Sequence, residues 1–405
     1  MRDIKDLHIA AQLFSFSPYK KNLYEFYDKL EKIKKLVDLK ALMIGVNLSE
    51  DEKEVVIKKC KQLDIKTYLW YPVLADLPEH LPLDDFKSVG YGNNRESFIL
   101  QTQKDSGEDF AFLCPNKEME DNRLRLFFAD ILNNHDFDGV FLDKIRYPSP
   151  ANGLSDMLSC RCDICRKLAS DPEIFSEDIL NSIVDKILTA DSVKKLKEAV
   201  NFIADNLSGF MKFREDSVFN LVKRYVKIAR SMNLSVGIDL FSPSLSQIVS
   251  QDYSRLCELS DWIKPMIYLK TMGPAGVPLE IYSLIKIIKS INKNIPERII
   301  IECFEELLVM NLPVSLESFS ANGIPVVNFP QEISKIHSKI NSDNIKIYPG
   351  FEAVKFAPIC DMSKEGIKEY LAFVKHLNLE GFVLSWDISK IPLEHFEFVS
   401  DYYKS

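Results

Sequence analysis

The amino-acid sequence predicts an α/β protein folded as a closed (β/α)8 barrel, the TIM barrel, with long insertions after strands three and four. Short apolar runs rich in β-branched and aromatic residues alternate with amphipathic stretches, the pattern of parallel strands joined by helical crossovers. We count eight such runs in the 405 residues, as a barrel requires. The turn after the first run, residues 13–18, contains no glycine, whereas an open doubly wound sheet usually has a glycine-rich turn there.

The predicted strands and helices follow one another in barrel order. We expect strands at residues 7–14, 41–46, 66–73, 139–147, 235–241, 262–268, 345–351 and 381–386. We expect helices, recognised by apolar residues at i, i+3 and i+4, at residues 23–37, 49–63, 122–133, 216–232, 251–259, 279–291 and 363–376. The apolar run 299–304 also looks like a strand and would be a ninth, so we assign the region from about 297 to 330 to an insertion.

Two connections, residues 74–120 and 149–234, are much longer than the others. In a barrel, long loops that follow strands lie over the C-terminal face, where active sites are built. No internal repeat or low-complexity linker divides the chain. We therefore expect residues 1–405 to form a single catalytic barrel domain, with residues 149–234 as a helical insertion that carries a cysteine cluster.

Composition indicates an ordinary soluble globular protein, with 46% hydrophobic and 27% charged residues. The net charge of −8, without a run of Lys or Arg, argues against nucleic acid or an anionic membrane as a partner and favours a neutral or cationic ligand. No signal-peptide stretch and no apolar span of 18 residues is present in the sequence, so we expect a cytoplasmic location. The sequence does not predict an oligomeric state.

The residues at the predicted strand ends form an acidic and aromatic set, and side chains at these positions reach the substrate in barrel enzymes. Glycosidic bond cleavage needs two carboxyl groups, and aromatic faces pack against sugar rings. The candidate catalytic residues are Asp143, Glu352 and Asp239. The candidate substrate-binding residues are His8, Trp70, Arg146, Tyr147, Lys264, Tyr268, Trp386 and Asp387.

Asp143 is the strongest catalytic candidate, because it follows a run buried on both faces and a buried carboxylate is costly without a partner. Arg146 is one such partner, which leaves open a purely structural pair of Asp143 and Arg146. An acid after a strand can also merely cap the next helix or pair with a neighbouring cation. His8 lies early in its strand, where a core histidine is favoured over a catalytic one.

The fourth strand carries a recognisable motif. The segment from Asp138 to Asp143, followed by Arg146-Tyr147-Pro148, resembles the strand-four signature of poorly characterised glycoside-hydrolase-like barrels, and polygalactosaminidase-like barrels share its first half. This resemblance implies that Asp143 is catalytic. The Met-x-Tyr sequence ending at Tyr268 is similar to chitinase-like barrels, but the acidic segment of chitinases is absent, so their substrate-assisted chemistry is not implied.

Three cysteines, Cys160, Cys162 and Cys165, lie within six residues. This spacing is typical of metal sites in chains without a secretion signal. Together with an earlier Cys-Pro-Asn, this cluster is similar to the zinc site of family 42 β-galactosidases. The resemblance implies a structural Zn²⁺ site with ligands Cys114, Cys160, Cys162 and Cys165. Four thiolates close a tetrahedron and leave no position for a catalytic water, so such a site would stabilise the loops beside Asp143. The alternative is a core cysteine beside a redox or incidental cluster.

The favoured function is a glycoside hydrolase that acts on a carbohydrate substrate, with Asp143 as nucleophile or stabilising carboxylate and Glu352 as the acid. Asp239 and Asp387 are the alternative acids. Two other functions stay open: a carbohydrate-binding barrel without turnover, and a lyase or aldolase barrel. The last would need a divalent metal or a Schiff-base lysine, and nothing in the sequence around Lys264 indicates a lowered pKa.

Overall fold

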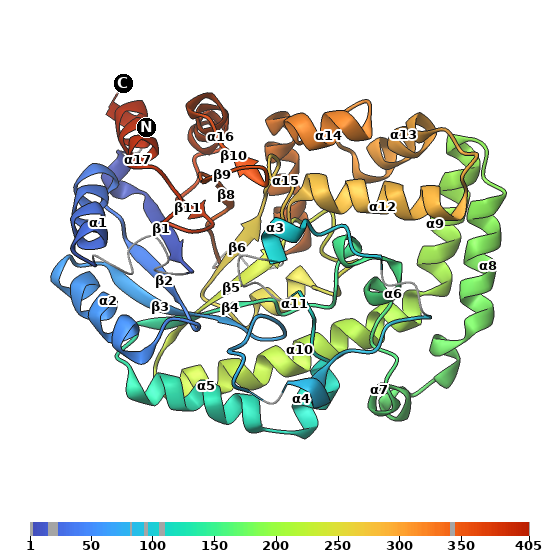
Figure 1. Cartoon of the computed structure of the whole chain (residues 1–405), viewed down its shortest axis with the longest axis horizontal. Coiled ribbons are helices and arrows are strands. Elements are labelled where there is room, and N and C mark those ends of the chain that lie inside the picture. The colour runs from blue at the N-terminus through green and yellow to red at the C-terminus, as the bar shows by residue number, and fades with distance from the viewer. Residues whose placement is uncertain are drawn as a thin grey trace.

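The computed structural model of the chain describes residues 3–14, 23–81, 83–92, 96–104, 110–340 and 345–404. Its main sheet is entirely parallel and closes on itself as a barrel with helices outside, as predicted (Figure 1). The barrel strands are β1 (His8–Leu13), β2 (Ala41–Gly45), β3 (Lys66–Pro72), β4 (Gly139–Asp143), β5 (Ser235–Phe241), β6 (Trp262–Met266), β7 (Lys346–Ile347), β8 (Gly350–Glu352) and β11 (Gly381–Ser385).

The seventh strand position of the barrel is made by β7 and β8 together. Both segments pair with β6, β8 also pairs with β11, and Pro349, which has no N–H to donate, lies between them. The pairing of β1 with β11 and of β5 with β6 then completes a ring of eight positions. Two further short strands, β9 (Lys355–Phe356) and β10 (Cys360–Asp361), form a hairpin outside the barrel.

Helices follow the strands in alternation and cover the outside of the barrel. They are α1 (Leu23–Val37), α2 (Glu50–Gln62), α5 (Arg123–Asn134), α10 (Ser208–Ser231), α11 (Tyr253–Cys257), α12 (Val277–Ile291), α16 (Lys364–His376) and α17 (Leu393–Lys404). The last of these was not predicted. Figure 1 shows α17 beside α1, so the two ends of the chain meet next to the first strand. Within the described residues, no helix combines the length and apolarity needed to cross a bilayer.

The segment after α12 is helical throughout, with α13 (Glu297–Leu308), α14 (Leu316–Asn322) and α15 (Phe329–Lys339). The expectation that residues 299–304 look like a strand was therefore wrong, although the region does lie outside the barrel. Ile300, Ile301, Cys303 and Phe304 are buried in α13 and acidic residues cover its other side, so the apolar run is one face of an amphipathic helix.

The long connection after β4 is mainly helical, with α6 (Leu154–Met157), α7 (Asp163–Leu168), α8 (Glu177–Leu188) and α9 (Val193–Asn206) before α10. Figure 1 shows α8 and α9 at the side of the molecule, next to α12 and α13. The amide of Asn292 donates to the carbonyl oxygens of Ile187 at 2.9 Å and Ala190 at 2.8 Å, which fastens the end of α8 to the barrel. The connection after β3 carries α3 (Gln101–Lys104) and α4 (Pro115–Glu120).

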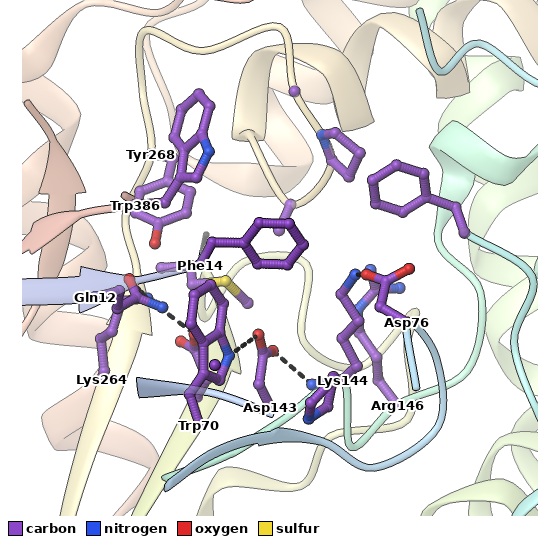
Figure 2. A pocket seen from close by; sticks show the side chains of 18 of the residues that line it. Gln12, Phe14, Trp70, Asp76, Asp143, Lys144, Arg146, Lys264, Tyr268 and Trp386 are labelled. Atoms are coloured by element: carbon purple, nitrogen blue, oxygen red, sulfur yellow. Dashed lines mark hydrogen bonds and ion pairs between the residues drawn. The ribbon is translucent and has the colours of Figure 1, made fainter. Parts of the chain in front are cut away.

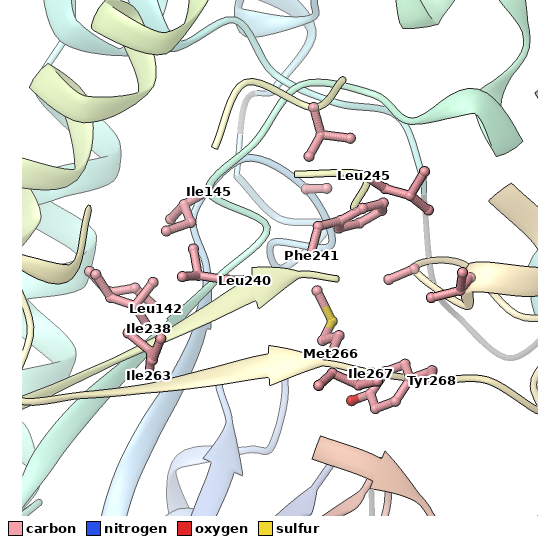
Figure 3. Packing of buried hydrophobic residues seen from close by; sticks show 14 of the residues in the cluster. Leu142, Ile145, Ile238, Leu240, Phe241, Leu245, Ile263, Met266, Ile267 and Tyr268 are labelled. Atoms are coloured by element: carbon pink, nitrogen blue, oxygen red, sulfur yellow. The ribbon is translucent and has the colours of Figure 1, made fainter. Parts of the chain in front are cut away.

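Side chains on the strands divide into two apolar layers because successive residues of a strand face opposite sides. Leu142, Ile238 and Ile263 belong to the large core between the sheet and the helices (Figure 3). Phe141 and Trp262 lie inside the barrel with their rings stacked 5.1 Å apart. A Cβ atom on Gly237 would lie 2.2 Å from the ring of Trp262, so this glycine makes room for the indole. The filled interior forms the floor on which the polar residues at the strand ends rest.

Candidate active site

A pocket opens over the C-terminal ends of the strands, directly above the filled interior of the barrel. Its lining comes from most strand ends and from the connections after β3 and β6: Gln12, Phe14, Gly45, Val46, Asn47, Trp70, Pro72, Asp76, Gln103, Phe110, Asp143, Lys144, Arg146, Asp239, Lys264, Met266, Tyr268, Thr271, Gly273, Pro274, Ala275 and Trp386. In Figure 2, Tyr268 and Trp386 lie on one side, Asp76, Lys144 and Arg146 on the other, and Asp143 between them. Two aromatic rings of the pocket thus face its charged residues Asp76, Lys144 and Arg146 across Asp143.

Asp143 is the last residue of β4 and is 7% exposed. The indole Nε1 of Trp70 donates a hydrogen bond of 2.8 Å to Oδ2 of Asp143, and the backbone N–H of Lys144 donates to Oδ1 (Figure 2). Both oxygens thus have donors, and no oxygen of Asp143 lies within 4.0 Å of the Arg146 guanidinium. The structural pair of Asp143 and Arg146 that the sequence left open is not formed.

Asp239 on β5 faces the same pocket and forms an ion pair of 2.8 Å with Lys264 on β6. The ammonium group of Lys264 also donates to Oε1 of Gln12 at 3.0 Å, and all three side chains are almost fully buried. Burial raises the pKa of Asp239 to about 8; the charge of Lys264 opposes this rise and the nearby carboxylate of Asp143 adds to it. Asp239 is therefore a carboxyl group that can hold a proton at neutral pH.

Lys144 and Asp76 form an ion pair at the pocket wall. Both residues have left-handed backbone angles, with φ of 49° for Lys144 and 53° for Asp76. For a lysine this conformation costs about 1 kcal/mol, and such strained residues cluster at functional sites. The ammonium group of Lys144 also lies 4.7 Å from the centre of the Phe110 ring. The pair joins the end of β4 to the connection after β3.

Arg146 is held by aromatic rings rather than by an acid. Its guanidinium carbon lies 4.4 Å from the centre of the Phe112 ring and 4.5 Å from that of Phe241. One hydrogen bond of 3.0 Å joins it to the carbonyl oxygen of Tyr147. Such stacking fixes the plane of a guanidinium group and leaves its edges free for hydrogen bonds.

Glu352, predicted as the acid partner of Asp143, does not line this pocket. It is fully buried at the end of β8, where Oε1 accepts from the backbone N–H groups of Lys270 at 2.7 Å and Thr271 at 2.9 Å. Its Oε2 accepts from the hydroxyl of Tyr370 on α16 at 2.9 Å. Because the connection after β6 folds back onto this carboxylate, Glu352 fastens that connection and is not open to a substrate.

Three predicted substrate-binding residues also lie away from the pocket lining. His8 lies at the start of β1, at the opposite end of the barrel, and stacks on Tyr348 at 4.2 Å. Tyr147 is fully buried, 4.3 Å below the guanidinium of Arg214. Asp387 is buried and accepts a hydrogen bond of 3.0 Å from the backbone N–H of Ser389, so it shapes the turn after β11.

The four predicted metal ligands, Cys114, Cys160, Cys162 and Cys165, are buried and their Sγ atoms lie within 4.8 Å of one another. The Sγ atom of Cys114 is 3.8 Å from that of Cys162 and 3.4 Å from that of Cys165. Thiolates about 2.3 Å from a central zinc in a tetrahedron would lie about 3.8 Å apart, so this donor set fits a metal ion. The Asn116 amide donates to Cys165 Sγ at 3.3 Å, the kind of outer contact that supports a thiolate ligand.

Sequence reasoning missed several residues of the pocket lining, namely Phe14, Asp76, Phe110 and Lys144. Lys144 directly follows Asp143 in the strand-four motif, and its charge beside a catalytic candidate was the available signal. Phe110 and Asp76 lie in the long connection after β3, and only the length of that connection pointed to them.

Comparison with known proteins gives information on the fold alone. No family model and no curated protein sequence matches the chain. Among solved structures, the glycoside hydrolase domain of PgaB (BpsB) from Bordetella bronchiseptica superposes with a TM-score of 0.50 at 10% identity, covering 98% of this chain and 96% of that domain. The chain therefore shares its barrel fold with this domain.

Two further structures align over 98% of this chain at 8% identity each. The spore cortex-lytic enzyme SleL from Bacillus megaterium has a TM-score of 0.47, with 74% of its chain covered. A chitinase from Chromobacterium violaceum has a TM-score of 0.46, with 99% covered. At such identities the activity of this chain has to be inferred from its own residues.

Proposed function

We propose that the protein is a glycoside hydrolase that cleaves O-glycosidic bonds with Asp143 and Asp239 as its two carboxyl groups. The observation that carries this proposal is that both side chains lie in one aromatic-walled pocket at the C-terminal face of the barrel. Trp70, Phe14 and Trp386 supply flat apolar surface for the C–H faces of a sugar ring. Asp239 replaces Glu352 as the partner of Asp143, because Glu352 does not line the pocket.

We assign the role of general acid to Asp239. Its raised pKa keeps a proton available at neutral pH, and its Oδ1 has no hydrogen-bond partner among the described residues. Asp143 accepts hydrogen bonds at both oxygens, which suits a carboxylate that attacks or stabilises the developing positive charge at the sugar carbon. Opposite environments for two neighbouring acids are the usual basis for such a division of roles.

The register of the strands supports a retaining mechanism. Leu142 on β4 pairs with Ile238 on β5, so Asp143 and Asp239 are the next residues on adjacent strands. Adjacent strands lie about 4.8 Å apart. Carboxyl groups carried at neighbouring positions of adjacent strands can approach the separation of about 5–5.5 Å found in retaining enzymes, as opposed to the 6.5–9.5 Å or so of inverting ones.

We further propose that the four-cysteine site holds a structural zinc ion. Cys114 directly precedes α4 in the connection after β3, and Cys162 directly precedes α7 in the connection after β4. These same connections contribute Asp76, Phe110 and Arg146 to the pocket. The zinc would fix the relative position of the two connections. We also propose a cytoplasmic location for the protein, which is consistent with eight cysteines that form no disulfide in the structure.

A Schiff-base mechanism on Lys264, which a lyase or aldolase would require, is not supported. Burial lowers the pKa of Lys264, but Asp239, Tyr268 and Asp143 together outweigh this effect and raise it. The ammonium form is therefore favoured, whereas a nucleophilic lysine needs a neutral amine.

The test of the proposed function compares substrates with good and poor leaving groups. Wild-type protein and Asp239→Asn are assayed on unactivated oligosaccharides and on dinitrophenyl glycosides. The dinitrophenolate leaving group of the latter departs without protonation. We expect Asp239→Asn to lose about 10²–10⁴-fold in kcat on oligosaccharides and far less on the activated glycosides. Sugar binding without any turnover by the wild-type protein would instead indicate a carbohydrate-binding barrel.

A further inference from the structure

The charged groups of the pocket are unevenly paired. Its lining contains the cations Lys144, Arg146 and Lys264. The ammonium group of Lys264 donates to Asp239 at 2.8 Å and to Gln12 at 3.0 Å, and that of Lys144 pairs with Asp76. Arg146 has no carboxylate oxygen within 4.0 Å among the residues that the structure describes. Of these three cations, Arg146 is thus the one without a side-chain acceptor in the described part of the chain, and we take it as the group available to a ligand.

The surroundings of Arg146 preserve its binding capacity. The side chain is only 3% exposed, and a guanidinium group has five N–H donors, of which one is used on the Tyr147 carbonyl. Phe112 and Phe241 flank the group at 4.4 and 4.5 Å and have no polar side-chain atom to accept a hydrogen bond. Buried guanidinium donors form their strongest hydrogen bonds with an anionic acceptor. A carboxylate can accept from two of these donors in parallel.

Glu280 is the acid with the largest electrostatic effect on Arg146, but it is occupied elsewhere. Its carboxylate is fully buried, outside the pocket lining, and accepts from Ser149 Oγ at 3.0 Å and from the backbone N–H groups of Ala151 at 2.9 Å and Ala275 at 3.0 Å. Burial lowers the pKa of Arg146 to about 10, so the group stays charged at neutral pH. Glu280 therefore stabilises the positive charge of Arg146 and occupies none of the N–H donors of Arg146.

We infer that Arg146 forms an anion subsite and that the substrate is an acidic oligosaccharide whose uronic acid carboxylate binds there, beside the Asp143 reaction centre. The inference rests on the proposed glycosidase function and names its substrate class. In Figure 2, Arg146 lies across Asp143 from Trp386 and Tyr268, so a sugar packed on these two rings can direct a charged substituent toward the guanidinium. The net charge of −8 had favoured a neutral or cationic ligand. Salt screens the distant charges that make up most of this net charge, whereas a cation in contact with the ligand is screened far less. The local charge of Arg146 therefore decides the preference.

Binding is measured by calorimetry in the Asp143→Asn background, so that no turnover consumes the ligand. The probes are trigalacturonate and triglucuronate, their neutral counterparts galactotriose and cellotriose, and the methyl esters of the acidic pair. We expect at least one acidic trisaccharide to bind ten times more tightly than its neutral counterpart and its methyl ester. The ester removes the charge without altering the protein, so the comparison does not depend on a variant of Arg146 that folds.

Arg146→Gln in the same background should lower affinity for the acidic trisaccharide at least tenfold and leave that for the neutral one nearly unchanged. The matched control is Arg214→Gln, which removes another buried, ring-stacked guanidinium that lies outside the pocket lining and should leave the preference intact. Equal affinity for acid, ester and neutral sugar, no binding of any acidic probe, or a preference that survives Arg146→Gln would overturn the inference. Turnover of neutral glycosides by the wild-type protein would then still support the proposed hydrolase.

Discussion

The indole N–H of Trp70 donates a 2.8 Å hydrogen bond to Oδ2 of Asp143 and so ties the end of β4 to β3. Indole nitrogen can only donate, so the carboxylate must be the acceptor. Trp70 is also in edge contact with Phe14, whose ring centre lies 5.7 Å away. One tryptophan therefore both orients the proposed catalytic carboxylate and contributes to the aromatic surface beside it.

Trp70→Phe keeps the aromatic surface and removes the donor. A buried acceptor left without its partner costs about 1–3 kcal/mol, which corresponds to a loss of about 5- to 150-fold if it appears in kcat. Steady-state assays of kcat and KM measure it. The control is Tyr71→Phe, because the Tyr71 hydroxyl donates to the Leu124 carbonyl on the helix side of β3. Equal kcat values for Trp70→Phe and wild type would exclude this role for the indole.

The pH dependence of kcat should reflect Asp239. Burial raises its pKa to about 8, so the acid is protonated and active below that pH, and activity falls as pH rises through about 8. Lys264 lowers this pKa, so Lys264→Met should move the alkaline limb upward by about 1–3 pH units. A pH–rate profile of both proteins provides the measurement. A limb that stays in place or moves down would show that another group controls it.

Glu352→Gln should affect stability more than catalysis. The carboxylate accepts from two backbone N–H groups and the Tyr370 hydroxyl, and an amide cannot accept from all three. We expect the free energy of unfolding to fall by about 1–3 kcal/mol in urea titrations. The kcat of the folded variant should equal that of wild type. A large loss of kcat with unchanged stability would restore Glu352 as a candidate acid.

Metal content tests the cysteine site. Protein purified under reducing conditions without chelator should contain about one equivalent of zinc, and Cys162→Ser should lose the metal and melt at lower temperature. Cys60→Ser is the matched control, since Cys60 is buried on α2 away from the cluster and should leave the zinc in place. Less than about half an equivalent of zinc in the unstripped wild-type protein would argue against a closed structural site.

The barrel could be predicted from sequence because short apolar runs alternate with amphipathic stretches, a local pattern that needs no knowledge of the rest of the chain. The same pattern could not distinguish Asp239 from Glu352. Among the described residues, the carboxyl group of Asp239 is bound by Lys264 and stays at the pocket. The carboxylate of Glu352 instead accepts from the backbone N–H groups of Lys270 and Thr271, in the connection after β6. The donors that reach an acid at a strand end depend on the path by which the long connections fold back over the barrel. That path is set by tertiary structure and not by the local sequence.

Residues 299–304 show the same limit for secondary structure. A short, largely apolar run fits either a buried strand or the inner face of a helix. Here the segment is helical, and α13 packs against α9 and α12. Lys144 was missed for another reason. Its ion pair with Asp76 lies in the pocket wall, and both residues have a left-handed backbone. Neither the pair nor this backbone conformation can be read from the residues next to Lys144 in the sequence.

The most direct test of the whole account is the turnover of Asp143→Asn on the best substrate found for the wild-type protein, beside Asp138→Asn as a matched control. Asp138 accepts from the Thr67 backbone N–H at 2.8 Å at the opposite end of the same strand. We predict that Asp143→Asn folds and loses at least about 10³-fold in kcat, whereas Asp138→Asn keeps the kcat of wild type. Undiminished turnover by a folded Asp143→Asn variant would contradict the account.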